Sequence, residues 1–218
     1  MRQPTVSGLA ATFCGLIALA ASASGAVTLT TSTVGRVTTV GTSSTVLTAG
    51  TSLGVGDSSN NTQVFASIFN FTINASAAEI AAATQITFTI SATGQTGTGP
   101  DVRLVALNTD DNAVQSSDAS AAGQIVGTYP AATIAAGLPN FLLTFDVTSI
   151  VKADALAGNF SSFRLDCALV ANDGDGGGDV FVFGTIGNQD AQLNVIPEPT
   201  GVAMMTCALT LGLVRRRR

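Results

Sequence analysis

The chain has 218 residues, with 14 acidic and 9 basic side chains, a single tyrosine, and neither histidine nor tryptophan. Without histidine, the commonest general base is missing and neither serine–histidine nor cysteine–histidine nucleophiles can form, so the composition predicts a protein that is not an enzyme. Residues 27–195 carry thirteen acidic and four basic side chains, a formal net charge of −9 that does not suit a nucleic-acid partner or an anionic membrane.

Residues 1–26 have the features of a secretory signal peptide. Arg2 supplies a positive start, residues 9–21 are apolar, and small residues follow up to Ala26. Two sites of the A-x-A type end at Ala23 and Ala26, and we expect signal peptidase to cleave after Ala26. The alternative is an uncleaved N-terminal membrane helix, which the short apolar stretch and the small residues closing it disfavour.

Alternating apolar and polar residues predict short strands throughout residues 27–195, separated by Gly, Asn and Asp. The expected strands are 27–33, 36–40, 45–47, 63–73, 85–91, 102–108, 124–128, 141–147, 161–170, 180–184 and 191–195. In the longest of them Phe65, Phe69, Phe71 and Ile73 share one face, as core residues do. So many short strands in one domain predict an all-β fold, with two antiparallel sheets packed as a sandwich.

Two short helices interrupt this pattern. Ser76 and Glu79 are spaced as a capping box ahead of an alanine-rich turn that ends near Ala83. The second helix follows a strand, with Asp146 or Thr148 as its N-cap and Gly158 as its stop. Its expected apolar stripe consists of Val147, Ile150, Val151 and Leu156.

The order of these segments carries a resemblance. A phenylalanine-rich strand, an alanine-rich helix and Ile-Thr-Phe-Thr-Ile at 86–90 precede Phe-Asp-Val-Thr-Ser-Ile-Val at 145–151, Phe-Arg-Leu at 163–165 and Ala-Gln-Leu-Asn-Val at 191–195. Over residues 46–195 the chain resembles DNRLRE-type, carbohydrate-binding-module-like jelly-roll domains. The resemblance implies a jelly-roll-like accessory module of the extracellular space, with polysaccharide as a partner. The chain offers little for a sugar platform, because its phenylalanines read as core and only Tyr129 remains.

One segment has the composition of a metal-binding loop. Asn172 to Asp179 contains Asp173, Asp175 and Asp179 among glycines, and such carboxylates can wrap calcium. It is not an EF-hand, because the third acidic position of that loop falls on Gly177 and the closing glutamate position on Gly184. The alternative is an exposed glycine-rich loop, with no cofactor at all.

The remaining carboxylates and cysteines do not suggest a catalytic role. Asp110, Asp111 and Asp118 fall among Asn and Ser, where we expect solvated loop carboxylates rather than a glycosidic pair. Cys14 and Cys207 lie in the terminal signals, so the body has only Cys167 and no disulfide of its own. Cys167 alternates in phase with the apolar residues of its strand, which predicts a buried, inert thiol.

The C-terminal segment reads as a sorting signal. Pro197-Glu198-Pro199 is followed by an apolar stretch, 200–214, and by Arg215, Arg216, Arg217 and Arg218. Terminal arginines stay in the cytoplasm, which places the rest of the chain outside. A helix over 200–214 would measure about 22 Å, which is short of a hydrocarbon core of about 30 Å. Such a helix suits transient retention better than a lasting anchor, although an anchor that is never cut is the alternative.

These three parts, in this order, resemble the PEP-CTERM sorting tail of bacterial surface and matrix proteins. The resemblance implies recognition, and cleavage near the motif, by a membrane-embedded exosortase. We therefore expect a signal peptide at 1–26, a sandwich domain at 27–195 and a sorting tail at 196–218. The expected function is that of a non-catalytic exported surface or extracellular-matrix protein, with a carbohydrate-binding module or a calcium-stabilised adhesion domain as alternatives.

Overall fold

The computed structural model describes residues 26–58, 63–108, 112–158, 160–168, 178–188 and 190–198. The predicted signal peptide before Ala26 and the predicted membrane helix at 200–214 lie outside these residues. Within the described part of the chain, no helix is both long enough and apolar enough to cross a membrane. The residues from Ala26 to Pro197 form one compact unit.

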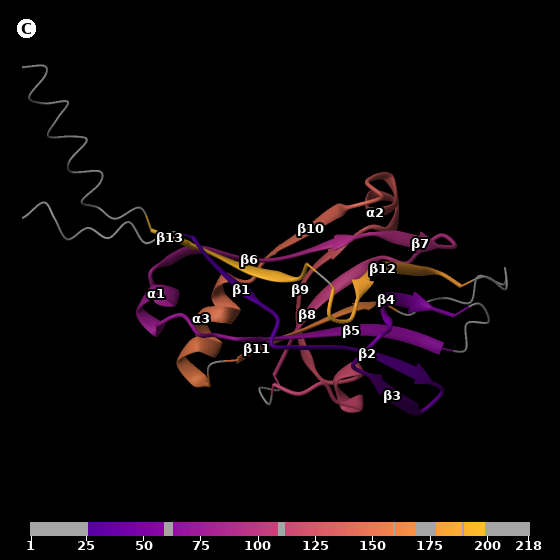
Figure 1. Cartoon of the computed structure of the whole chain (residues 1–218), viewed down its shortest axis with the longest axis horizontal. Coiled ribbons are helices and arrows are strands. Elements are labelled where there is room, and N and C mark those ends of the chain that lie inside the picture. The colour runs from indigo at the N-terminus through magenta and orange to yellow at the C-terminus, as the bar shows by residue number, and fades with distance from the viewer. Residues whose placement is uncertain are drawn as a thin grey trace, which may run out of the picture. The chain divides into compact units, whose positions relative to one another are not determined.

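Two sheets, antiparallel in every pairing, make up this unit (Figure 1). The first has four strands in the order β1 (Val27–Thr30), β13 (Gln192–Pro197), β6 (Ala83–Ala92) and β10 (Phe141–Asp146). The second runs β7 (Gly94–Thr96), β12 (Val180–Thr185), β4 (Ser52–Asp57), β5 (Gln63–Thr72), β11 (Phe160–Cys167), β8 (Val102–Leu107) and β9 (Gly123–Tyr129). In addition, β2 (Thr33–Val40) pairs with β5, and β3 (Ser43–Leu47) pairs with β2. The predicted two-sheet antiparallel sandwich is confirmed.

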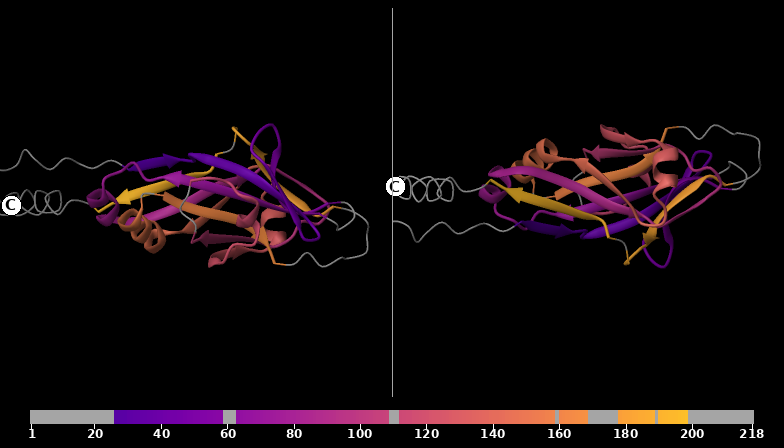
Figure 2. Two further views of the ribbon diagram at one scale, coloured as in Figure 1. Left: turned by 90° about the horizontal axis from the view of Figure 1, so that it is seen from below. Right: turned by 90° about the horizontal axis from the view of Figure 1, so that it is seen from above.

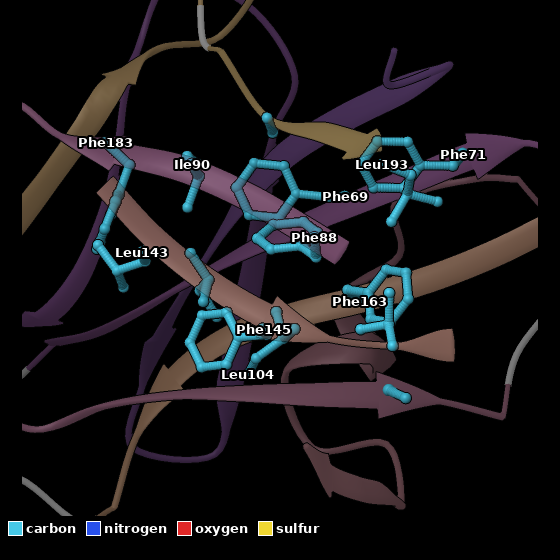
Figure 3. Close-up of a cluster of buried hydrophobic side chains, with 14 of the residues drawn as sticks. Phe69, Phe71, Phe88, Ile90, Leu104, Leu143, Phe145, Phe163, Phe183 and Leu193 are labelled. Atoms are coloured by element: carbon cyan, nitrogen blue, oxygen red, sulfur yellow. The ribbon is translucent and has the colours of Figure 1, made fainter. Parts of the chain in front are cut away.

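The main core lies between the inner faces of the two sheets, where Phe88 of β6 occupies the centre (Figure 3). Its ring centroid lies 5.6 Å from that of Phe69 and 5.6 Å from that of Phe163, with Phe71 at 6.0 Å and Phe145 at 6.3 Å. All of these rings are buried. Edge-on and tilted contacts of this kind add to the free energy of burying the rings, so this cluster joins the two sheets.

A second, smaller cluster covers the outer face of the larger sheet. It consists of Val37, Ile68, Val105 and Leu107, packed against Val46, Val114, Ala119 and Ala121. The last three come from the segment 112–122, which includes the 3₁₀ turn η1 (Ser116–Ala119). Because this segment lies across strands β2, β5 and β8, the larger sheet is buried on both faces in this region.

The first predicted helix is confirmed as α1 (Ala77–Ala81), between β5 and β6. The Ser76 hydroxyl accepts from the backbone N–H of Glu79, and a Glu79 carboxylate oxygen accepts from the backbone N–H of Ser76 at 2.9 Å. Hydrogen bonds from the Ser76 side chain and backbone hold the pKa of Glu79 below its ordinary value. The capping box thus forms as the spacing predicts.

The second predicted helix is α3 (Thr148–Ala157), and it packs beside α1 (Figure 1). Val147 rather than Asp146 or Thr148 is the N-cap, although Asp146 accepts from the backbone N–H of Thr148 at 3.0 Å. Leu156 is 81% exposed, so its expected place on the apolar stripe is wrong. At about 100° per residue, Leu156 lies about 140° around the helix from buried Val151, which turns it to solvent.

Four elements were absent from the sequence-based expectation: β4, β7, the 3₁₀ turn η1 and the helix α2 (Ala131–Ala136). In β4, Leu53 and Val55 are fully buried, but Gly54 and Gly56 alternate with them and weaken the strand signal. The structure explains both glycines, since a Cβ on Gly54 would lie 3.1 Å from a Val180 methyl and one on Gly56 would clash with the backbone of Asp179. These two glycines are therefore required by the close approach of β12 and the residue before it, and they do not mark a loop.

We predict that Phe88→Ala lowers the free energy of unfolding by about 3–5 kcal/mol, because the cavity would open at the junction of four other rings. Urea denaturation monitored by circular dichroism measures the change. Leu156→Ala removes an exposed side chain and serves as the control, with an expected change within about 0.5 kcal/mol. Equal effects of the two substitutions would contradict the assignment of Phe88 to the centre of the core.

Candidate functional site

The predicted sorting motif begins inside the folded unit. Pro197 is the last residue of β13 and pairs with Ala83 of β6, past a register shift that follows Ile196. The Thr84 hydroxyl donates to the carbonyl of Ile196 at 3.1 Å. Glu198 is exposed, whereas Pro199, Arg215, Arg216, Arg217 and Arg218 lie outside the described residues.

The other end of the unit lies on the neighbouring strand. β1 pairs with β13 in antiparallel register, with Val27 opposite Val195 (Figure 2). Ala26, after which we expect signal cleavage, immediately precedes this pair and is exposed. The chain therefore enters and leaves the folded unit at the same end of the four-stranded sheet.

Of the three predicted calcium ligands, only Asp179 is described, while Asp173 and Asp175 lie outside the described residues. Asp179 is 7% exposed, and its Oδ1 accepts from the backbone N–H of Thr98 at 2.6 Å. Its own N–H donates to Oδ1 of Asp57 at 2.9 Å, and its carbonyl accepts from the N–H of Asp57 at 2.9 Å. The structure thus brings to Asp179 a second carboxylate, 122 residues away in sequence, that sequence reasoning missed.

Two glycines allow the backbone to close around Asp179. Gly56 has φ +138°, and a Cβ there would lie 1.8 Å from the Asp179 carbonyl oxygen. Gly97 has φ +63°, and a Cβ there would lie 2.2 Å from Oδ1 of Asp179. Neither position accepts a side chain. Across the described ranges, no three or more His, Cys, Asp or Glu side chains gather as a metal-binding group, so Asp57 and Asp179 stand as a pair.

A second charged group lies on the outer face of the larger sheet. Asp166 accepts from Nε of Arg103 and from Nε of Arg164, both at 2.8 Å. Arg164 also donates to the carbonyl oxygens of Asp118 at 2.5 Å and Ala121 at 3.0 Å. These bonds hold the segment that covers the outer face, so the group has a structural role.

The expectation that Asp118 is a solvated loop carboxylate is wrong, since it is 3% exposed. Its Oδ2 accepts from the backbone N–H of Gln115 at 2.8 Å and so caps η1. Burial follows from the packing of this turn against the sheet, which the polar sequence around it does not reveal. Asp110 and Asp111 lie outside the described residues.

Tyr129 does not serve as an exposed sugar platform. Its ring centroid lies 5.7 Å from Phe141 and 5.1 Å from Phe145, edge-on to both. Its hydroxyl donates to the carbonyl of Thr144 and accepts from the N–H of the same residue. Both the ring and its hydroxyl are therefore engaged in joining β9 to β10.

A depression of about 260 Å³ opens where the end of β6 meets β12. Its lining consists of Ser91, Thr93, Asn140, Phe183, Gly184, Asn188 and Asp190. The Asp190 carboxylate is oriented by the backbone N–H of Ser91 at 2.9 Å and by its hydroxyl at 2.5 Å. Because Phe183 is fully buried, a ligand in this depression would be held by hydrogen bonds rather than by ring stacking.

Cys167 is buried at the end of β11, as its place in the strand predicts. Burial raises the pKa of its thiol to about 11, and the negative charge of Asp166 adds to this shift. The thiol is therefore protonated at neutral pH and is not a nucleophile.

No protein-family model matches this chain, and no curated protein matches it in sequence.

We predict that Cys167 resists alkylation by iodoacetamide at pH 8 at least 100-fold more strongly than an exposed cysteine, because a pKa of about 11 leaves about one thiol in a thousand ionised. Mass spectrometry of the peptide that contains Cys167 measures the labelling. Full labelling in 6 M guanidinium is the control, and rapid labelling of the folded protein would contradict the burial.

We also predict that Arg164→Ala destabilises the fold by about 3–5 kcal/mol, because it leaves the buried Asp166 partly unpaired and removes the Arg164 donor from the carbonyls of Asp118 and Ala121. The change is measured by urea denaturation, with faster proteolysis within residues 112–122 as a second readout. Lys152→Ala removes a cation on α3 that forms no ion pair with a described residue, and should change stability by less than about 0.5 kcal/mol.

Proposed function

We propose that this chain is a non-catalytic, exported surface or extracellular-matrix protein that an exosortase-type system sorts through its C-terminal tail. The observation that carries the proposal is the place where the fold ends. The sandwich stops at Pro197, the first residue of the motif, and Glu198 is exposed beyond it. A motif that begins where the folded unit ends is accessible to a membrane enzyme without unfolding of the domain.

The state of the described carboxylates supports a non-catalytic role. Asp118, Asp166 and Asp190 each accept hydrogen bonds from neighbouring protein groups, and two of the three are buried. Glu79 and Asp146 bond to the starts of helices. With these groups in structural roles and no histidine in the chain, we assign no general base.

The fold proposal is more specific than a two-sheet sandwich. We take the body to be a jelly-roll-like accessory module of the DNRLRE type, which the antiparallel pairing and the short helices α1 and α3 support. Such a module has no need of a reaction centre of its own. Signal peptidase and exosortase would then be its partners during export, and the tail helix would be its transient contact with the membrane.

The pairing of β13 also restricts where the tail can be cut. Pro197 pairs with Ala83, and the carbonyl of Ile196 accepts from Thr84, so the bonds before Pro197 belong to the sheet. A protease needs an extended, unpaired segment. We therefore predict that the mature protein ends at Pro197 or beyond it, as intact mass measurement of the exported form would show. A mature C-terminus at Ile196 or earlier would contradict this prediction.

Localisation tests the proposal directly. A chain truncated after Pro197 keeps all of β13 and loses the rest of the tail. We expect it to accumulate in the culture medium instead of in the fraction that holds the full chain. Replacement of Glu79 by Gln, a single charge change outside the tail, is the control and should leave localisation unchanged. If the truncated and full chains accumulate in the same fraction, the sorting proposal fails.

A second candidate function, binding of extracellular polysaccharide, is favoured by the polar depression beside Asp190. The variant Asn140→Gly with Asn188→Ala removes two side-chain amides from its lining, and glycine suits the φ of +73° at position 140. We expect retention on a matrix polysaccharide to fall at least tenfold, as measured by pull-down. Asn74→Ala, on an exposed asparagine elsewhere, should leave retention unchanged. No retention of the unmodified chain would rule this function out.

A further inference from the structure

The strand β4 ends in a buried carboxylate whose interactions within the protein are incomplete. Asp57 is 1% exposed, and its Oδ1 accepts the N–H of Asp179 at 2.9 Å. Its Oδ2 is buried and has no hydrogen-bond partner among the described residues. A buried carboxylate oxygen without a partner is costly, because the protein does not replace the water it has lost.

The neighbouring carboxylate adds to this cost. Asp179 is 7% exposed and is tied to Asp57 by two hydrogen bonds that involve both of its backbone polar groups. Within the described residues, neither side chain forms an ion pair, since both ion pairs found there are made by Asp166. Two carboxylates at one buried place repel each other unless a cation or a proton intervenes.

One further oxygen, the carbonyl oxygen of Gly178, lies near the Asp179 carboxylate. A Cβ built on Gly97 would lie 2.2 Å from Oδ1 of Asp179 and 2.5 Å from the carbonyl oxygen of Gly178. These two oxygens therefore both pack closely against Gly97, where a side chain would collide with them. Three segments meet here: the end of β4, the turn after β7 and the residues before β12.

We propose that Asp57 and Asp179 bind a calcium ion, with Oδ2 of Asp57 as the ligand that has no other partner. The donors are carboxylate and carbonyl oxygens, which suit a hard cation. Calcium accepts six to eight oxygens in an adaptable arrangement, whereas magnesium demands a near-ideal octahedron, so an irregular set of oxygens from the end of β4 and the residues before β12 favours calcium.

The proposed ion has a mechanical consequence that does not depend on how the chain is exported. It would neutralise the two carboxylates and tie the end of β4 to the residues before β12, and the hydrogen bond from the N–H of Thr98 to Asp179 would extend this link to the turn after β7. These strands pair through β12, which contacts β7 over only three residue pairs. The cation thus stabilises the part of the sheet with the shortest strand.

The substitution Asp57→Asn tests the proposal, because it should not lower stability in EDTA yet should abolish the stabilisation by calcium. Asparagine keeps an oxygen for the N–H of Asp179 but removes the unpaired charge. We expect this variant to be at least as stable as the unmodified chain in EDTA and to gain nothing from calcium. Asp179→Asn, which retains an acceptor for Thr98, should also lose most of the calcium response.

The experiment uses the full chain in detergent, with thermal melting in calcium chloride or EDTA and calcium binding by titration calorimetry. For the unmodified chain, we expect the melting temperature to rise by about 5–10 °C when calcium is about 100 times its Kd. Asp101→Asn removes the same charge from an exposed residue, keeps an acceptor for the N–H of Ala131, and should retain the full response.

Equal melting temperatures in calcium and EDTA, with no binding heat, would overturn the proposal. So would a calcium response in Asp57→Asn as large as that of the unmodified chain. If Asp57→Asn is stabilising in both buffers and the unmodified chain ignores calcium, no ion is bound at Asp57 and the proposal fails. A response to magnesium equal to the response to calcium would overturn the assignment of calcium.

Discussion

The packing of Phe88 against the phenylalanines of the opposite sheet is the interaction on which the rest of the structure depends. The four-stranded sheet has one buried face, and its central strand β6 presents Ile86, Phe88 and Ile90 to the core, all fully buried. No disulfide is available to the body, and the described ion pairs lie within the larger sheet. Apolar burial, with ring geometry adding specificity, therefore holds the two layers together.

The outer face of the larger sheet is also partly apolar and must be shielded from water. The segment 112–122 shields it by covering Val37, Ile68 and Val105. Polar side chains hold this cover in place, with Arg164 donating to its carbonyls and Asn70 donating to the carbonyl of Ala113 at 3.1 Å. Arg164, which is also paired with Asp166, is thus engaged in holding this segment against the sheet.

The two candidate functional regions, the ends of the domain and the pair of buried acids, lie away from the segment 112–122. Both ends of the domain leave the four-stranded sheet together, because β1 and β13 are neighbours and antiparallel. The paired acids Asp57 and Asp179 lie instead on the larger sheet, between β4 and β12. Sorting and cation binding would therefore act through different sheets, and a change in one need not disturb the other.

Local patterns in the sequence determined much of this protein. Alternation placed eleven of the thirteen strands, and the spacing of Ser76 and Glu79 placed α1, because strands and caps depend on residues within a few positions of each other. Only the tertiary structure decided the rest. Strand β4 exists because β12 approaches its glycines, Asp118 is buried because η1 packs on a sheet, and Asp57 meets Asp179 across 122 positions. Each of these depends on which distant segments lie side by side, and a single sequence carries no local signal for that.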